Sequence, residues 1–230
     1  MTNEASSRRR PHRDAAARLF HSPVHPLRHE LSPELRKVGL RIFGSSLGLA
    51  FALNTTGVHH VNVLGGALSL QLASLRADRS ARLLADGMRH ERYGVTSLPH
   101  SGVVVDVGAN VGDFALTVAK LRPAMRVIAI EPVPSTYFFL RLNLELNGIP
   151  YLSASHLANP RAHGVIAINS AVAGENASSF LPVSYPLTGD SKMAAVNART
   201  QNAGGSSSWR TIEVPSLLLP EYLSRHGISW

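Results

Sequence analysis

Residues 103–120, VVVDVGANVGDFALTVAK, constrain the fold of this chain more than any other stretch. They begin with apolar, β-branched residues and reach Asp106, a pattern typical of a buried strand that ends in a carboxylate. Gly108 and Gly112 follow with the spacing of a tight turn, and a helical apolar pattern starts at Phe114. A strand that passes through a glycine-rich turn into a helix is the first unit of a Rossmann-like sheet, in which the free N–H groups of the helix face a ligand.

A second apolar strand is predicted at residues 126–131, and it ends in Glu131 beside Pro132. An acidic side chain at this place can accept hydrogen bonds from both hydroxyls of a ribose. A carboxylate suits a free ribose, because it would repel a 2′-phosphate. The two strand ends together predict a nucleoside-type ligand, bound across the ends of two parallel strands.

The pattern of the remaining residues extends this unit into an α/β fold. A helix is predicted at residues 134–146, where Asn147 and Gly148 provide a C-terminal stop. The later predicted elements are a strand at 165–168, a short strand at 179–183 within a long polar loop (174–205), a strand at 211–214 and a helix at 215–225. The predicted fold class is therefore α/β with a Rossmann-like sheet.

Three regions are predicted along the chain. Residues 1–32 are rich in Arg, His, Ser, Pro and Ala and are predicted to form a disordered basic tail. Residues 33–100 are predicted to form a helix that starts after Ser32, a hairpin of residues 61–64 with 67–72, and a helix at 80–92. Residues 101–230 are predicted to form the Rossmann-like domain.

The net charge of +8 belongs mainly to the tail. Residues 1–42 contain nine Lys and Arg against four acidic residues, which accounts for +5 of the +8. The charge is therefore weak support for nucleic-acid binding, and we predict no specific nucleic-acid partner. The chain has no cysteine, which excludes disulfides and thiolate metal sites, and we predict no metal site. No apolar run reaches the roughly 18 residues of a membrane helix, so no transmembrane helix is predicted.

The sequence leaves the compartment and the oligomeric state open. We favour the cytoplasm, and the alternative is that the Arg-rich N-terminus targets the chain to an organelle. Glu4 and Asp14 weaken this alternative, because transit peptides are poor in acidic residues.

Four blocks of the sequence resemble the FkbM family of S-adenosylmethionine-dependent methyltransferases. The first block, DVGANVGD at residues 106–113, is similar to the D-V-G-A-N-x-G signature of that family. The other blocks are IEPVP at 130–134 followed by LNLELN at 142–147, SAV at 170–172, and VPSLL at 214–218. The resemblance extends over about residues 60–230 and implies a class I methyltransferase sheet preceded by a small N-terminal extension.

The resemblance implies that S-adenosylmethionine is bound by polar and small residues near the ends of the predicted strands. They are Asp106, Gly108 and Asn110 for the methionine moiety, Gly112 for the close turn, Glu131 for the ribose hydroxyls, and Ser170 and Ala171 for the adenine. The implied reaction is methyl transfer from the sulfonium to a hydroxyl oxygen of a small molecule or carbohydrate, with the reacting atoms aligned by the protein. A base would remove the hydroxyl proton, and the sequence names no candidate for this catalytic residue.

The sequence departs from the family pattern near residue 230. The next block of the family is a strand reading roughly K-I-D-V-E-G, and the sequence stops where this strand should begin. The resemblance therefore implies a C-terminally truncated methyltransferase with an incomplete sheet and an exposed apolar edge. We expect such a chain to bind the cofactor more weakly than a complete enzyme.

Two other functions compete with this interpretation. The first is an NAD-dependent oxidoreductase, which uses the same sheet and an acidic residue after the second strand. Its fingerprint is G-x-G-x-x-G, whereas this chain has Asn110 where the middle glycine would stand. The second is a truncated nucleotide-binding protein without catalysis, in which Glu131 and the glycines bind a ligand but no methyl group is transferred.

Overall fold

The computed structural model describes residues 30–75, 93–156, 159, 161–174, 180–186 and 209–228. All seven predicted site residues lie within these ranges. The predicted basic tail lies outside the described residues up to residue 29. The predicted helix at 80–92 and most of the long polar loop also lie outside them.

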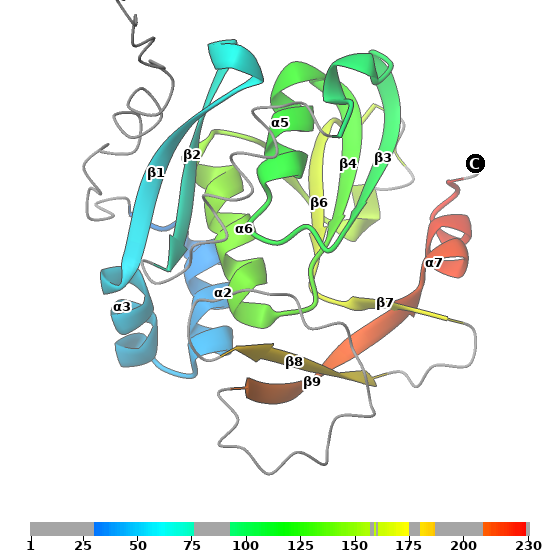
Figure 1. The fold of residues 1–230 in the computed structure, drawn as a ribbon. Helices are drawn as coiled ribbons and strands as arrows, with labels where there is room; N and C mark the ends of the chain where they lie inside the picture. The colour runs from blue at the N-terminus through cyan, green and yellow to red at the C-terminus, as the bar shows by residue number, and fades with distance from the viewer. Residues whose placement is uncertain are drawn as a thin grey trace, which may run out of the picture.

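A four-stranded parallel sheet forms the centre of the fold, with the strand order β3-β4-β6-β5 (Figure 1). Its strands are β3 (Ser101–Val107), β4 (Ala124–Ile130), β6 (Gly164–Ile168) and β5 (Tyr151–Leu152). The helix α5 (Asp113–Leu121) connects β3 to β4, and α6 (Pro134–Leu146) follows β4. A parallel sheet joined by helices is the arrangement predicted from the sequence, and the Rossmann-like α/β fold class is confirmed.

One face of this sheet is covered by several layers. The helices α5 and α6 pack on it, and behind them lie α2 (Pro33–Phe43) and a hairpin made of β1 (Thr56–Val63) and β2 (Leu68–Leu75). The helix α2 begins as predicted, because the Ser32 hydroxyl accepts a hydrogen bond from the Leu35 N–H at 3.2 Å. A short helix that the sequence did not predict, α3 (Ser46–Asn54), lies between α2 and the hairpin in the chain. Burial of these apolar faces provides most of the driving force for folding.

The hairpin is longer than predicted. Its strands pair from Thr56 with Leu75 to Val63 with Leu68, and the turn between them contains the 3-10 segment η1 (Leu64–Gly66). Further 3-10 segments are η2 (Val95–Ser97) and η3 (Ala154–His156).

The side-chain amides of Asn143 in α6 and of Asn147, the C-cap residue of this helix, bond to the edge of β2 that does not pair with β1. Asn143 accepts a hydrogen bond from the Ala73 N–H at 2.6 Å and donates one to the Ala73 carbonyl at 3.1 Å. Asn147 does the same to Gln71, with distances of 3.0 and 2.7 Å. Each amide therefore presents a donor and an acceptor to β2, as a neighbouring strand would.

A second, smaller sheet follows the central one and has the strand order β7-β9-β8. Its strands are β7 (Ala171–Ala173), β8 (Phe180–Pro186) and β9 (Trp209–Leu218), and the helix α7 (Leu219–Arg225) ends the described chain. The prediction of a helix at 215–225 was wrong for its first part. Residues 216–218 pair with β7, and the helix starts only at Leu219, with Pro220 in its first turn. A short apolar run fits a strand or a helix equally well, and the available partner decides between them.

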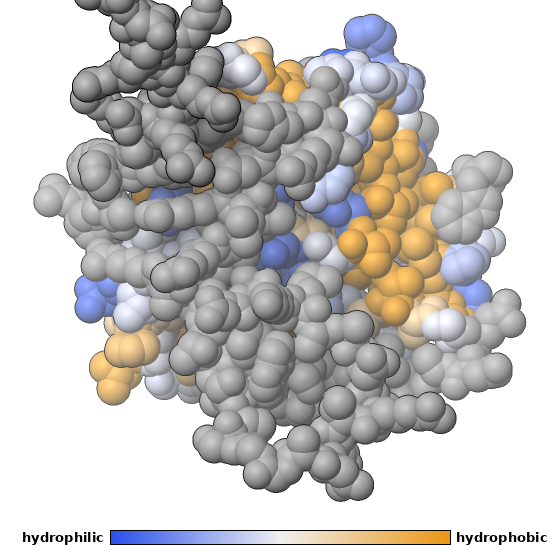
Figure 2. Space-filling model, viewed as in Figure 1, coloured by the Kyte–Doolittle hydropathy of each residue, from blue (hydrophilic) through white to orange (hydrophobic). Residues whose placement is uncertain are grey.

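The helix α7 packs on part of the other face of the central sheet. Leu223 of α7 packs with Ile128, Ile130 and Ile166 of the sheet. Figure 2 shows a band of hydrophobic side chains that extends from β3 towards α7. Within the part of the chain that the structure describes, no helix is long and apolar enough to span a membrane.

Candidate functional site

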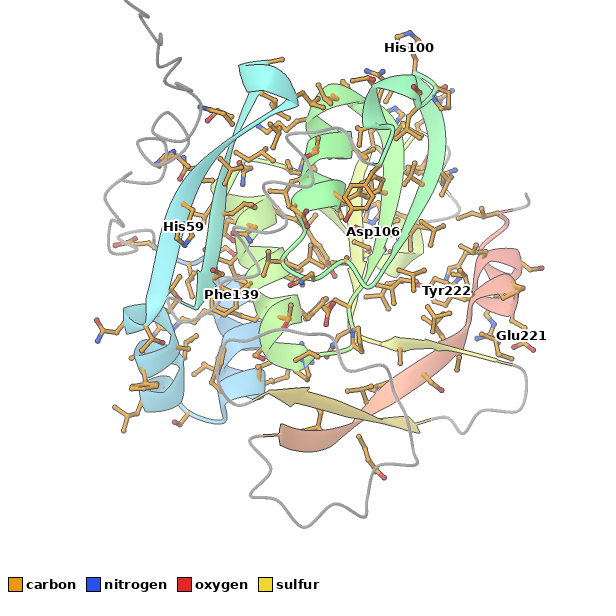
Figure 3. The ribbon with its side chains drawn as sticks, viewed as in Figure 1. His59, His100, Asp106, Phe139, Glu221 and Tyr222 are labelled. Carbon is orange, nitrogen blue, oxygen red and sulfur yellow. The ribbon has the colours of Figure 1, made fainter. Side chains whose placement is uncertain are left out.

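The site lies at the carboxyl ends of three neighbouring strands, where open α/β sheets bind ligands. Asp106 is near the end of β3 (Figure 3). Glu131 directly follows β4, and Ser170 follows β6 after one intervening residue. The sheet order places β4 between β3 and β6. The three predicted side chains therefore line one edge of the sheet in the same order as the strands.

The turn at residues 108–112 has the tight, left-handed backbone that its glycines suggest. Gly108, Asn110 and Gly112 have φ angles of 79°, 50° and 93°, which place all three in the left-handed region. The N–H groups of Gly108 and Ala109 both donate to the Ile130 carbonyl at 2.8 and 3.0 Å. These bonds join the turn to the end of β4. Asn110 is one of the two non-glycine residues with a positive φ among the described residues, which marks it as a position under constraint.

Gly112 is required by space as well as by conformation. A Cβ atom at this position would overlap the side chains of Leu140 and Leu116, both of which are fully buried. The absence of a side chain lets the start of α5 approach α6 closely. The role predicted for Gly112, a close turn, is thus consistent with its packing.

Glu131 is buried and held by two backbone amides. The Asn110 N–H donates to its Oε2 at 2.9 Å, and the Val133 N–H donates to its Oε1 at 2.8 Å. Burial raises the pKa of Glu131 to about 7, although both N–H donors act in the opposite direction. The carboxylate thus joins the end of β4 to the turn after β3, and it has acceptor capacity left for a ligand.

Asp106 and Asp113 form a second acidic feature of the site. Burial and the nearby charge of Asp113 raise the pKa of Asp106 to about 7. Burial raises the pKa of Asp113 to about 6, opposed by the backbone N–H of Phe114. The Oδ2 atoms of both residues are buried and have no hydrogen-bond partner among the described residues. Two unpaired carboxyl oxygens at one place favour a ligand that carries positive charge.

Ser170 and Ala171 are both buried, but the Ser170 hydroxyl is already engaged. It donates to the Pro215 carbonyl at 2.7 Å, which joins the end of β6 to β9. Ala171 begins β7 and pairs with Ser216. These two residues are thus near the third strand end, where their predicted contact with adenine would use the backbone and the alanine methyl group rather than the hydroxyl.

Three residues of the site were not predicted from the sequence. Asp113 could have been found as an acidic residue in the first turn of a helix at a ligand-binding turn. Asn169 donates to the carbonyls of Glu131 and Pro132 at 2.8 and 3.0 Å and so fixes the segment after β4. Asn143 donates to the Val111 carbonyl at 2.8 Å, a contact over 32 positions that no local pattern reveals.

The arrangement fits S-adenosylmethionine by the chemistry of its donors and acceptors. That molecule carries a cationic ammonium and a cationic sulfonium, and the site offers two unpaired carboxyl oxygens. It also carries ribose hydroxyls, and Glu131 lies where a ribose-binding acid is expected. Among the described residues, no group of three or more His, Asp or Glu side chains is arranged to bind a metal ion.

Comparisons with known proteins point to the same class. Residues 73–162 match the model of the TRM5/TYW2 methyltransferase domain, a match that covers less than half of the 230 residues. Methyltransferase sdnD of Sordaria araneosa is 40% identical over 55 residues, which is 24% of this chain and 21% of that protein. Methyltransferase 1 of Beauveria bassiana is 29% identical over 76 residues, which is 33% of this chain and 30% of that protein. The matches therefore span at most about a third of these curated relatives.

A solved structure, M. jannaschii TYW2 in complex with AdoMet, aligns with 50% of this chain and 42% of its own. Its sequence identity is 22% and its TM-score is 0.33, which is too low to carry an argument, so the fold rests on the sheet order given above. The family and sequence matches confirm the predicted class in its coarser form, a methyltransferase domain. The FkbM type stays a prediction.

Proposed function

We propose that this chain binds S-adenosylmethionine at the carboxyl ends of β3, β4 and β6 and is part of an enzyme that transfers its methyl group. The observation that carries the proposal is the pair of buried, unpaired oxygens on Asp106 and Asp113 beside a turn tied to Glu131. A cationic ligand would offset both charges, and a ribose would use the remaining acceptor capacity of Glu131.

Each part of the cofactor has a residue of this chain to hold it in the proposal. Asp106, with the backbone of Gly108 and Asn110, would hold the methionine moiety, and Gly112 allows that backbone to turn. Glu131 would orient the ribose. When bound, the cofactor would supply an electrophilic methyl group on sulfur, and the protein would contribute chiefly by aligning that methyl group with the acceptor atom.

For the acceptor, we propose a hydroxyl oxygen of a small molecule or carbohydrate, as in the FkbM type. The support is the four sequence blocks in their order, of which the first three include residues at the strand ends described here. The two relatives described above are named only as methyltransferases, so they leave the acceptor open.

Isothermal titration of the unliganded chain with S-adenosylhomocysteine tests the cofactor proposal. We expect binding, and we expect Glu131→Ala to weaken it by about 1–3 kcal/mol, because the ribose hydroxyls lose their acceptor. Glu131→Gln is the second variant, since it keeps the shape of the side chain and still offers one acceptor oxygen. Unchanged affinity in both variants would remove Glu131 from the site.

Titration with NAD under the same conditions separates the proposal from the oxidoreductase alternative. Tight binding of NAD without binding of S-adenosylhomocysteine would overturn the methyltransferase proposal. Binding of S-adenosylhomocysteine without methyl transfer to any hydroxyl acceptor would favour the binding-only alternative.

A further inference from the structure

The side chain of Asn143 links the hairpin β1–β2 to the turn at residues 108–112. The amide of Asn143 is fully buried, and its three polar contacts are all to backbone atoms. Two of these contacts are to Ala73 of the hairpin, and the third is the bond to the Val111 carbonyl inside the turn. One amide therefore uses its oxygen and both of its N–H groups to join two segments that are remote in sequence.

The turn is held at two successive residues from opposite directions. The Asn110 N–H donates to Glu131, which lies on the ligand side, and the Val111 carbonyl accepts from Asn143, which lies on the hairpin side. Asn110 has a φ angle of 50°, a left-handed conformation that asparagine adopts more readily than most non-glycine residues. The bond from Asn143 is thus placed to support this conformation.

Two side chains one helical turn apart can both bond to β2, because the distance between them along the helix matches the distance between two alternate residues of a strand. Asn143 and Asn147 are one turn apart, which is about 6 Å along a helix. Ala73 and Gln71 are two residues apart, which is about 6.7 Å along a strand. The two amides therefore meet two successive outward-facing backbone positions of β2.

We propose that Asn143 is a positioning residue of the cofactor site, through which the hairpin β1–β2 holds the turn at residues 108–112 in its binding conformation. The hairpin is then part of the binding machinery although it does not line the strand ends. The statement about cofactor affinity rests on the proposed function, but the link between hairpin and turn is a property of the unliganded chain.

Asn147 provides a matched control, because it makes the same pair of bonds to β2. Its remaining N–H group donates to the Asn143 carbonyl on its own helix at 2.7 Å and not to the turn. Asn143→Ala and Asn147→Ala therefore both loosen the hairpin, but only the first also frees the turn. A merely structural role predicts similar effects of the two variants at residues 108–112.

Hydrogen exchange of the unliganded chain, read by mass spectrometry, tests the link. We expect Asn143→Ala to accelerate exchange about tenfold in peptides covering 107–112 and 68–75, as the loss of a buried hydrogen bond implies. We expect Asn147→Ala to accelerate exchange only in 68–75. Unchanged exchange of the turn in Asn143→Ala, or equal acceleration by both variants, would overturn the proposal.

If Asn143→Ala does not fold, a second experiment on the wild-type chain tests the same link. In low concentrations of denaturant, the turn and the hairpin should exchange through a common opening, with the same dependence on denaturant. Independent openings of the two segments would overturn the link.

Cofactor binding then separates the two proposals. Asn143→Ala should weaken S-adenosylhomocysteine about tenfold and Asn147→Ala less than about twofold. If wild type binds the ligand and both variants bind it equally well, the positioning role fails and the proposed function stands. If wild type does not bind it, the proposed function fails and the exchange result alone decides the link.

Discussion

The strands β3 and β4 are parallel neighbours of seven residues each, and both are rich in apolar residues, yet they differ strongly in burial. In β4, five residues are buried, whereas in β3 none is fully buried and Val107 is 55% exposed. β4 lies between two strands, while β3 is the edge of the sheet in the part of the chain that the structure describes. The number of neighbouring strands, more than composition, therefore decides how much of each strand is buried.

The same difference extends to the acidic residues at the ends of the two strands. Glu131 after β4 accepts two backbone hydrogen bonds, whereas Asp106 on β3 has a buried oxygen without a partner among the described residues. One carboxylate is thus largely satisfied within the chain. The other has its charge opposed by burial and by Asp113, so it gains more from a cationic ligand.

The largest loss of stability is expected at Gly112, in the turn between β3 and α5. Gly112→Ala should lower the free energy of unfolding by about 2–4 kcal/mol, because it adds strain at positive φ and overlap with two buried leucines. Gly148→Ala is the control, since Gly148 also has a positive φ but open space at its Cβ, and it should cost about 1 kcal/mol. Urea denaturation measures both, and equal costs would show that packing at the turn is loose.

Two valines that are partners in the sheet test whether the two strands differ in burial. Val104 on β3 pairs with Val127 on β4, and both pack against the same core, but only Val127 is fully buried. We expect Val127→Ala to cost about 2–3 kcal/mol and Val104→Ala about 1 kcal/mol or less, because truncation leaves a closed cavity only at the fully buried position. Similar costs, again from urea denaturation, would mean that β3 is covered in solution by something beyond the described residues.

The acidic residues predict how stability depends on pH. The pKa of Asp106 is about 7 in the folded chain against 3.8 ordinarily, so the folded state binds the proton more tightly. The free energy of unfolding should therefore fall as the pH rises from about 4 to about 7. Asp106→Asn should flatten this fall and stabilise the unliganded chain by on the order of 1–2 kcal/mol at pH 8.

Denaturation curves at several pH values measure this effect. Glu131→Gln is the matched comparison, because it removes a raised pKa but leaves one acceptor oxygen for the two N–H groups of Asn110 and Val133, so we expect little net gain from it. If the free energy of unfolding of Asp106→Asn fell with pH as it does in the wild type, the fall would be due to Asp113 or Glu131 instead.

The smallest effect on stability is expected at the exposed end of β3. Val107→Lys should change the free energy of unfolding by no more than about 0.5 kcal/mol, because the side chain is largely in solvent. It should also reduce concentration-dependent association, since a charged side chain blocks pairing at an open strand edge. Light scattering over a range of concentrations measures this, and unchanged association would show that the edge of β3 does not mediate contacts between chains.

The parts of this fold that follow from local pattern could be predicted from the sequence. The run from Asp106 to Phe114 specifies strand, turn and helix by residue type and spacing, and Glu131 marks the end of the next strand. The class of ligand follows from these same residues, because strand ends of this kind bind nucleosides.

The parts that depend on remote partners could not be predicted. Residues 216–218 fit a helix or a strand by their local pattern, and only pairing with β7 makes them part of β9. Asn143 is a helix residue by pattern, and nothing local shows that it contacts both Ala73 and Val111. Asp113 is an ordinary first-turn acid until burial leaves one of its oxygens without a partner among the described residues.

The contacts of Asn143 also set an order of events during folding. They join residues that are 70 and 32 positions apart, so the turn at residues 108–112 is complete only after a long chain segment has closed. During synthesis, residues 68–75 are made well before residue 143, and β2 must wait for α6 before its open edge is covered. We therefore expect the proposed cofactor site to be completed late in folding, after α6 has covered this edge of the hairpin.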